Sequence, residues 1–372
     1  MSFLKRERST LAEFMPGLDE ALAKLPLMEM EKPGSAALSL FRKAGGPGLL
    51  IPARFGGRGA TPLQVIHVQR ALAARSPSLA IATTMHHFSV ASVIGLAELD
   101  PERVAEILAL IAGQNLLMAS GFAEGRSGVS VLWSGMQVKR VPGGLVINGS
   151  KKPCSLAASM DLFTAGVLVP TESGMPHFAV IAIPANTAGL ERKPFWGTSI
   201  LGGAESDEVI LREAYVPDEQ AFYYSNENPA LLELSFLWFE MVITVSYLGV
   251  ASALVERVLN AAKGTATERT RLAIEIEGAA TALEGIARAM MAGESGNDAL
   301  AQVLFVRYAA QAAIGRITAL AAELLGGMAF ICSSDVGYLL AATTALAFHP
   351  PSRLSLTDAL DAYLSGQRLN MS

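Results

Sequence analysis

Cysteine, histidine and charged residues are scarce in this chain. Its 372 residues include two cysteines and five histidines, and charged residues make up only 17%. Two cysteines, Cys154 and Cys332, are too few for a disulfide framework. The net charge is −5 and no run of lysine and arginine occurs. This argues against nucleic acid as a partner, because neutralising phosphates requires clustered positive charge.

The uncharged runs bear on whether the chain spans a membrane. The run Met241 to Val255 is bounded by Glu240 and Glu256, whereas a span needs about 18 or more apolar residues. Residues 1–14 carry charge but no apolar signal core. We therefore expect no membrane partner and a reducing cytoplasm as the compartment. Because hydrophobic residues make up 51%, we expect surplus apolar surface to enter subunit contacts.

Helical periodicity dominates both ends of the chain. From Leu18 to about Asn115 apolar residues recur at spacings of three and four, notably over 64–74 and 79–99. Glycine and proline at 45–48 interrupt this pattern. The C-terminal part is rich in alanine and leucine, with helices expected at about 231–262, 267–292, 297–326, 333–347 and 356–366. Long helices with short connections favour an antiparallel bundle.

Between these helical regions the apolar period becomes two. From Leu116 to about Pro217, turn residues separate short strands such as 145–147, 163–169 and 180–183. No G-x-G-x-x-G follows a strand and opens a helix, which argues against a Rossmann unit. The sequence thus predicts an α+β protein with three domains: an N-terminal helical domain (1–115), a small antiparallel β domain (116–225) and a C-terminal helix bundle (226–372).

Residues 146–167, VINGSKKPCSLAASMDLFTAGV, are the most informative segment. A strand is expected to end at a tight Asn148-Gly149 turn, followed by two lysines, a short polar run and a second apolar strand. This segment resembles the flavin-facing "I-N-G-x-K-x-x-I-T-N" of the acyl-CoA dehydrogenase family. Further segments resemble the same family in the same order: GLLIPARFGG (48–57), ASGFAEGRSG (119–128), VILREAYVP (209–217) and LLGGMAF (324–330).

The resemblance implies the fold of that family, acyl-CoA dehydrogenase-like, and an FAD cofactor. By alignment, Ser155 takes the place of a threonine near flavin N5, and Pro153 that of a tryptophan against the ring. In the family, the segment that aligns with Gly326-Gly327 contacts the pyrophosphate of a flavin bound to the neighbouring subunit. Plain readings stay open, with Ser155 as a turn hydroxyl and Gly326-Gly327 as a helix end. The cofactor-binding residues that the resemblance implies are Ser120, Gly121, Phe122, Ser127, Pro153, Cys154, Ser155, Glu323, Gly326, Gly327 and Ser352.

The resemblance fails at the catalytic base. The family's usual "Y-E-G-T", whose glutamate removes a proton next to a thioester carbonyl, aligns with HPPS at 349–352. One substitute is Glu240, within one residue of the place where some members carry the glutamate; burial in its apolar run would raise its pKa. The other is His349, whose imidazole titrates near neutrality. Their plain readings are a solvated or interface ion-paired glutamate and a turn histidine before a double proline.

Two more features bear on ligands. The family's "R-x-x-F-G" stretch, which grips the adenosine end of the flavin, is missing, and residues 262–265 end the helix instead. Flavin binding is therefore expected to be rearranged or weaker. His86 and His87 lie on a helix without a cysteine or carboxylate at ligand spacing. We expect no metal site and interpret both histidines as packing or pocket-lining residues.

The resemblance leaves three functions open. The first is an FAD-dependent acyl-thioester dehydrogenase of a biosynthetic pathway, acting on an acyl-CoA or acyl-carrier-protein substrate. Its electron acceptor would be an electron-transfer flavoprotein or oxygen. The second is a flavin-dependent monooxygenase or oxidase, suggested by the lost glutamate and by His349, and the third is a non-catalytic scaffold. Members of the family are mostly tetrameric and sometimes dimeric, so we expect a homotetramer or homodimer.

Overall fold

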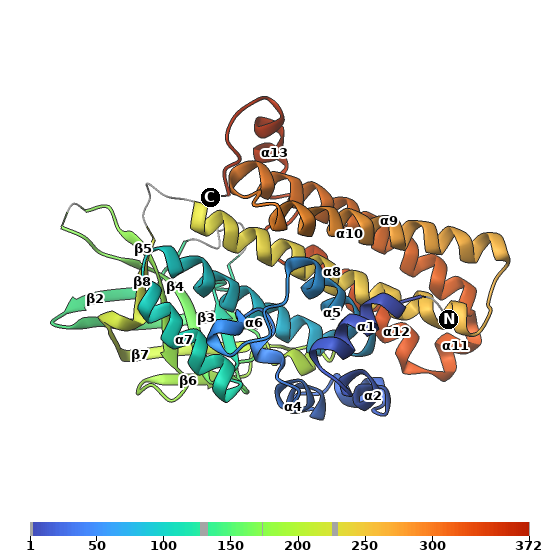
Figure 1. The fold of residues 1–372 in the computed structure, drawn as a ribbon, viewed down its shortest axis with the longest axis horizontal. Coiled ribbons are helices and arrows are strands. Elements are labelled where there is room, and N and C mark those ends of the chain that lie inside the picture. The colour runs from blue at the N-terminus through green and yellow to red at the C-terminus, as the bar shows by residue number, and fades with distance from the viewer. Residues whose placement is uncertain (1–2, 127–132, 173, 225–229, 372) are drawn as a thin grey trace.

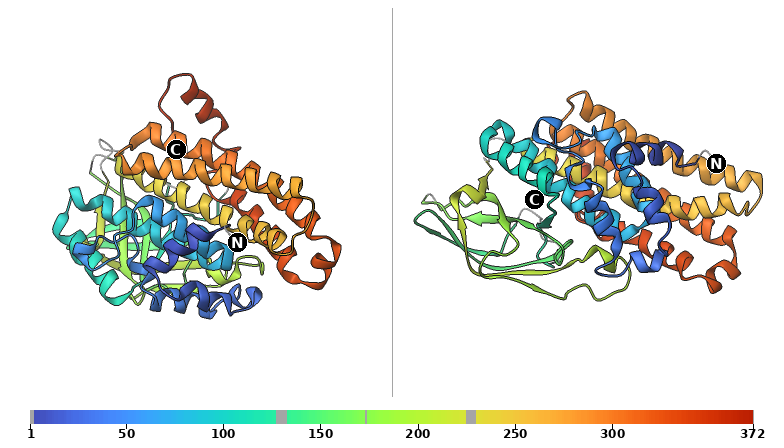
Figure 2. Two further views of the ribbon diagram at one scale, coloured as in Figure 1. Left: turned by 45° about the vertical axis from the view of Figure 1, so that its right-hand side comes forward. Right: turned by 60° about the horizontal axis from the view of Figure 1, so that its bottom comes forward.

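The computed structural model describes residues 3–126, 133–172, 174–224 and 230–371. Helices come first, strands follow, and a second set of helices completes the chain, as the sequence predicts. The strands gather at one end of the molecule, and the long C-terminal helices extend away from them (Figure 1; Figure 2). The predicted α+β class is confirmed.

Local signals set the ends of the N-terminal helices. At the start of the fifth helix, the Thr61 hydroxyl accepts from the Gln64 backbone while the Gln64 side chain accepts from the Thr61 backbone, and Pro62 follows the cap. The helices are α1 (Lys5–Phe14), α2 (Leu18–Ala23), α3 (Leu27–Met30), α4 (Ala36–Lys43), α5 (Pro62–Arg75), α6 (Pro77–Gly95) and α7 (Pro101–Gln114), with 3₁₀ turns η1 (Gly46–Gly48), η2 (Ala53–Phe55) and η3 (Leu96–Glu98).

The strands form two four-stranded sheets, with the orders β1-β4-β5-β8 and β2-β3-β7-β6. Most pairs are antiparallel, as predicted, but β1 runs parallel to β4. The reason is that the chain leaves β1, forms the β2–β3 hairpin in the other sheet, and returns in the same direction. The strands are β1 (Met118–Gly121), β2 (Gln137–Val141), β3 (Gly144–Cys154), β4 (Leu162–Val169), β5 (His177–Pro184), β6 (Leu190–Lys193), β7 (Asp207–Pro217) and β8 (Ala221–Tyr223), with 3₁₀ turns η4 (Gly202–Ala204) and η5 (Asp218–Gln220).

The tight turn predicted at Asn148-Gly149 is wrong. Strand β3 continues through both residues, and its register on β7 shifts there. Gly149 has φ of 143°, where a side chain is strained, and an added Cβ would lie 3.0 Å from Met136 Cγ. The Asn148 side chain donates to Glu213 Oε1 (2.6 Å) and accepts from Glu213 N (2.8 Å). Asn148-Gly149 therefore forms a β-bulge. Like a tight turn, this bulge places a glycine at positive φ.

Helix α8 lies at the centre of the helical part. It packs against α5 and α6 from the N-terminal region and against α9, α10 and α12 from the C-terminal region, so both regions share one core. A capping box of Thr265 and Glu268 starts α9 soon after α8 ends. The C-terminal elements are α8 (Ala230–Asn260), α9 (Ala266–Met291), α10 (Gly296–Leu325), α11 (Gly327–Cys332), α12 (Ser334–Thr343), η6 (Thr344–Phe348) and α13 (Thr357–Leu364).

Three helices are long and apolar enough to cross a membrane by length and composition: Pro77–Glu98, Ala230–Asn260 and Gly296–Leu325. The run of 241–255 considered in the sequence is only part of the second helix. In the most apolar windows, 83%, 89% and 50% of the residues are buried within the fold. Packing inside the chain therefore accounts for most of the apolar character of the first two helices.

The close contact of α8 with α5 gives a test of this core. An added Cβ at Gly249 would lie 2.6 Å from both Ala73 Cβ and Arg70 O. We expect Gly249→Ala to lower the free energy of unfolding by about 1–3 kcal/mol, because the backbone of a packed helix cannot move aside easily. Urea unfolding followed by circular dichroism measures this loss.

The matched control is Gly285→Ala on the exposed side of α9. No described atom lies within 4 Å of a Cβ added at Gly285. Alanine is the better helix former, so this variant is expected to gain roughly 0.5–1 kcal/mol. Equal changes in the two variants would contradict the close packing of α8 on α5.

Candidate active site

A buried ion pair joins the loop after β1 to strand β3. Lys151 Nζ donates to Glu124 Oε1 (2.6 Å) and to Ser134 Oγ (3.1 Å), and its side chain is 1% exposed. The Glu124 carboxylate also accepts from Gly135 N (3.0 Å). Burial opposes the charge of Glu124, but Lys151 and these donors hold its pKa below the usual range. The pair therefore fixes two of the family-like segments against each other.

The end of β3 presents different faces to solvent and core. Pro153 is exposed, whereas Cys154 is buried, and burial raises the pKa of the Cys154 thiol to about 12. Cys154 can thus reach a ligand only through its backbone. The hydroxyls of Ser155 and Ser206 lie 2.9 Å apart, and either can be the donor. One hydroxyl hydrogen of this pair is therefore available for a further acceptor.

Strand β1 lies at the edge of its sheet. It contains Ser120 and Gly121, and an added Cβ at Gly121 would lie 2.5 Å from the Phe163 ring, so glycine is required here by packing inside the chain. The Phe122 ring follows and packs edge-on against Phe88, with 5.3 Å between ring centroids. Ser127, also expected in the site, lies outside the described residues.

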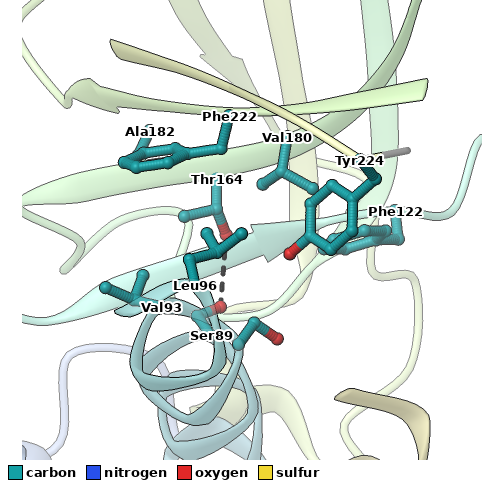
Figure 3. A pocket seen from close by; sticks show the side chains of 10 residues that line it. Ser89, Val93, Leu96, Phe122, Thr164, Val180, Ala182, Phe222 and Tyr224 are labelled. Carbon is teal, nitrogen blue, oxygen red and sulfur yellow. Dashed lines mark hydrogen bonds between the residues drawn. The ribbon is translucent and has the colours of Figure 1, made fainter. Parts of the chain in front are cut away.

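A pocket lies between the C-terminal half of α6 and the sheet that contains β1 and β4 (Figure 3). Its free volume is about 10 Å³, which is room for about one water molecule. Ser89 Oγ lies 3.2 Å from Thr164 Oγ1, so these two hydroxyls are paired with each other. Among the described residues that line it, none carries a carboxylate or a cation. The lining residues are Ser89, Ser92, Val93, Leu96, Phe122, Thr164, Val180, Ala182, Phe222 and Tyr224.

A row of aromatic rings leads from this pocket to His349. Phe122 of the lining contacts Phe88, and the Phe88 ring lies 5.5 Å from the Phe239 ring. The Phe239 ring in turn lies 6.4 Å from the His349 imidazole. The rings come from the loop after β1, from α6 and from α8. They place three apolar rings between the pocket and the histidine.

His349 follows η6 and is held by two residues of the helix bundle. The Tyr247 hydroxyl lies 2.8 Å from His349 Nε2, and Arg307 donates to the His349 carbonyl oxygen (2.6 Å). Burial, and then the charge of Arg307, lower the pKa of His349 to about 3. The imidazole is therefore neutral at physiological pH, and it can exchange hydrogen bonds without carrying a charge.

Glu240, the other candidate base, is bound to Arg307. Both side chains are 0% exposed, and the guanidinium donates to Glu240 Oε2. Burial raises the pKa of Glu240 to about 7, against the opposing effect of Arg307. The sequence anticipated the burial but not the partner, which lies in the same chain. This arrangement makes Glu240 half of a buried ion pair, so a catalytic role for it stays a prediction.

Three expected cofactor-binding residues lie elsewhere. Glu323, Gly326 and Gly327 are at the junction of α10 and α11, at the far end of the bundle from the strands (Figure 1). Gly326 has φ of 85° and ψ of 165°, which glycine tolerates, and it ends α10. Within one chain these residues do not meet Ser155, so their contact with a neighbouring subunit's flavin stays a prediction. Ser352 closes a local turn by accepting from Ser355 N (3.2 Å).

The paired histidines of α6 are packing residues. His86 Nδ1 accepts from Met118 N (3.1 Å), which leaves its hydrogen on Nε2, 2.9 Å from the Pro47 carbonyl oxygen. His87 is buried, and neither of its ring nitrogens has a hydrogen-bond partner among the described residues. Throughout the residues that the structure describes, no three histidine, cysteine, aspartate or glutamate side chains come together as a possible metal site.

Sequence reasoning missed Arg307, Tyr247 and Ser206. One signal was present, because Glu240 and Arg307 are each a single charge within an apolar stretch of helix. Charged residues are seldom fully buried unless paired, so two such lone charges of opposite sign indicate a buried ion pair. No comparable signal marks Tyr247 or Ser206.

Over its full length the chain is 42% identical to the isobutylamine N-hydroxylase of Streptomyces viridifaciens, and the match covers 100% of both proteins. No protein-family model matches the chain. The match therefore extends from the N-terminal helices of this chain to its C-terminal helices.

Solved structures confirm the fold. FMN-bound TdsC from Paenibacillus sp. A11-2 matches with a TM-score of 0.81 at 17% identity, over 100% of this chain and 99% of that chain. KijD3 in complex with FMN and dTDP-3-amino-2,3,6-trideoxy-4-keto-3-methyl-D-glucose matches with a TM-score of 0.84 at 19% identity, over 98% and 95%. At such identities the likeness concerns the fold alone.

The ion pair between the loop and β3 gives a test of the site's scaffold. We expect Lys151→Ala to lower the free energy of unfolding by about 3 kcal/mol, the low end for a broken buried pair, because it leaves the partly buried Glu124 carboxylate without a counter-charge. Urea unfolding monitored by fluorescence measures the change. The matched control is Lys152→Ala, whose ammonium reaches Glu208 (2.9 Å) from a side chain that is 31% exposed. Its loss is expected to be about 1 kcal/mol or less, and similar losses in both variants would refute a buried Lys151 ion pair.

Proposed function

The chain belongs to the acyl-CoA dehydrogenase-like flavoproteins, and we propose that it is a flavin-dependent monooxygenase that hydroxylates the nitrogen of a small aliphatic primary amine. As a member of this family it is a flavin-dependent oxidoreductase. The amine as substrate class is proposed from the name of the relative that is 42% identical over the whole chain.

The observation that carries the proposal is the state of His349. It lies next to Pro350, the residue that aligns with the usual carboxylate of the dehydrogenases of this fold, and it is a neutral imidazole held by Tyr247 and Arg307. A dehydrogenase needs a base that accepts a proton from the carbon next to the thioester carbonyl. The nearby carboxylate of Glu240 is bound to Arg307. The acyl-thioester dehydrogenase function therefore stays a prediction, and the site favours chemistry without a carboxylate base.

The residues fit a flavin. Edge strand β1 has one row of backbone groups unpaired within its sheet, and the end of β3 adds exposed Pro153 and the hydroxyl pair of Ser155 and Ser206. A flat ring with one polar edge requires such a combination of apolar surface and placed donors. We propose FMN in place of the predicted FAD, because α8 ends at Asn260 without the adenosine-gripping segment. When bound in reduced form, the flavin supplies two electrons and activates oxygen.

The overall reaction consumes the amine, one oxygen molecule and one reduced flavin. One oxygen atom forms a bond to nitrogen and ends as the hydroxyl of the hydroxylamine, and the other leaves as water. Reduced flavin would supply the two electrons and two hydrogens that this balance requires. The sequence has no G-x-G-x-x-G nicotinamide-binding unit. We therefore propose a separate flavin reductase as the partner that delivers reduced flavin.

The chain's own residues contribute binding and protection from water. The lining beside α6 offers apolar side chains to an alkyl group, which must displace some of them because the free volume is only about 10 Å³. The rings of Phe122, Phe88 and Phe239 add apolar surface toward His349. The neutral imidazole of His349 can donate a hydrogen bond to a bound molecule. An ammonium group finds no counter-charge in the pocket, so the neutral amine, whose lone pair can attack oxygen, is the form that binds.

This gives a pH prediction for the amine. An aliphatic ammonium has a pKa near that of lysine, about 10.4, so the neutral fraction rises about tenfold for each pH unit below that value. We expect the KM for the amine to fall about tenfold for each unit between roughly pH 7 and pH 9, with kcat unchanged. Initial rates of hydroxylamine formation at saturating oxygen measure both constants. A KM independent of pH would show that the ammonium form binds.

The function itself is tested with FMN, oxygen, a purified flavin reductase with NADH, and isobutylamine as the first amine. We expect hydroxylamine in the wild type. In His349→Ala we expect flavin binding to persist while the ratio of hydroxylamine to hydrogen peroxide falls about tenfold or more, because the placed hydrogen-bond donor is lost. His177→Ala is the matched control, since this histidine lies exposed on β5. Anaerobic bleaching of the flavin by an acyl thioester would instead establish a dehydrogenase.

A further inference from the structure

We propose that Tyr247 and Arg307 are positioning residues that hold His349 as the tautomer with its hydrogen on Nδ1. Glu240 acts one step further away, by neutralising Arg307, and not as a base. The assignment of a reaction to this histidine rests on the proposed function, whereas the tautomer and its cause are properties of the folded chain. The inference gives a role to three buried polar residues of the helix bundle that the chemistry above does not use.

Arg307 holds the backbone that carries His349. Its guanidinium donates to the carbonyl oxygens of His349 (2.6 Å) and Leu346 (3.3 Å), and it lies 3.5 Å from the Pro350 carbonyl oxygen. The last carbonyl groups of a helical turn lack partners within the turn, and η6 ends just before His349. The planar fork of arginine can satisfy several of these carbonyls at once, whereas the ammonium of lysine cannot reproduce its geometry.

Glu240 supplies the counter-charge that allows the Arg307 guanidinium to be buried. Arg307 and Glu240 are both 0% exposed, and neither charge would be tolerated there alone. The ion pair joins α8 to α10, and the same guanidinium then reaches the segment after η6. Glu240 therefore sets the position of His349 through Arg307, and no hydrogen bond between Glu240 and the imidazole occurs in the described part of the chain.

Tyr247 decides which ring nitrogen carries the hydrogen. Its hydroxyl is fully buried, and burial raises its pKa, so the phenol keeps its hydrogen. Among the described residues, the recorded partner of this hydroxyl is His349 Nε2 (2.8 Å). If the hydroxyl accepted a hydrogen bond there, its own hydrogen would be buried without an acceptor, which is unfavourable. Tyr247 therefore donates, Nε2 is unprotonated, and the neutral imidazole carries its hydrogen on Nδ1.

The charged surroundings favour the same state. Among the described residues, the titratable or charged groups linked to the His349 segment are Tyr247 and Glu240 on α8, and Arg307 and Tyr308 on α10. The positive charge of Arg307 disfavours the imidazolium form, and Tyr308 donates to the Pro351 carbonyl oxygen (3.1 Å) without touching the ring. No hydrogen bond to His349 Nδ1 is made within the described part of the chain. Its N–H is thus the donor that a bound molecule would meet.

Nitrogen NMR of the FMN-bound protein, labelled with ¹⁵N in the histidine rings, tests the tautomer without any turnover. The chain has only five histidines, and a His349→Gln variant assigns the signal. We expect His349 with its hydrogen on Nδ1 and His86 with its hydrogen on Nε2, so one spectrum should contain both tautomers. A His349 signal typical of the Nε2–H tautomer, or of the imidazolium form at neutral pH, would overturn the inference.

Tyr247→Phe isolates the contribution of one hydroxyl and retains the ring that fills the core. We expect the His349 signals to move to those of a mixture of tautomers, while the His86 signals stay unchanged. Tyr363→Phe is the matched control, because its hydroxyl bonds to Asp298 on the surface and does not contact a histidine. An unchanged His349 tautomer in Tyr247→Phe would show that the hydroxyl does not set it.

Turnover adds a second readout. In Tyr247→Phe and Arg307→Lys we expect the ratio of hydroxylamine to peroxide to fall about tenfold at an unchanged KM for the amine. A misplaced hydrogen-bond donor reduces the share of oxygen that reaches the amine, whereas it leaves the affinity for the amine unchanged. Glu240→Gln is expected to resemble Arg307→Lys, since it removes the counter-charge and keeps the shape. A normal ratio in Arg307→Lys would contradict the positioning role. If the wild type hydroxylates no amine, the proposed function fails, and the NMR result still decides this inference.

Discussion

Helix α8 is buried along most of its length, and the rest of the molecule is arranged around that constraint. A helix with apolar residues on all faces must be enclosed, and α8 is enclosed by α5 and α6 from one part of the chain and by α9, α10 and α12 from another. The two helical regions therefore form one core. The constraint also brings Phe239, Glu240 and Tyr247 to the middle of the molecule, where water is excluded.

Exclusion of water decides the chemical character of the site. Burial disfavours charge, so it raises the pKa of Glu240 and lowers that of His349. Arg307 is the cation beside Glu240 and His349. Its charge is balanced by Glu240, and its second terminal nitrogen donates to backbone carbonyls. What faces a ligand is then neutral: an imidazole, aromatic rings and paired hydroxyls. Such an interior suits a neutral amine and oxygen better than it suits proton removal by a carboxylate.

The same fold serves different reactions because the scaffold and the reacting groups are separable. In the β region, Lys151 and Glu124 hold the loop after β1 against β3, and this contact does not depend on the reaction. Lys151 and Glu124, which lie in two of the family-like segments, thus serve the scaffold whatever the reaction. The chain departs from the dehydrogenase pattern in the segment after η6. Tyr247 and Arg307 of the helix bundle hold that segment, and the Lys151–Glu124 pair takes no part in it.

The sequence by itself determined the features that depend on near neighbours in the chain. The helical period, the helix end at Gly326 and the order of the family-like segments required no tertiary information. It misjudged Asn148-Gly149, because a bulge and a turn use the same residues and only pairing with β7 separates them. Only the tertiary structure decided that Glu240 binds Arg307, 67 residues away, and that Tyr247 bonds to His349, 102 residues away. The physical reason is that periodicity and capping are local, whereas the partner of a buried polar group depends on which helix faces meet.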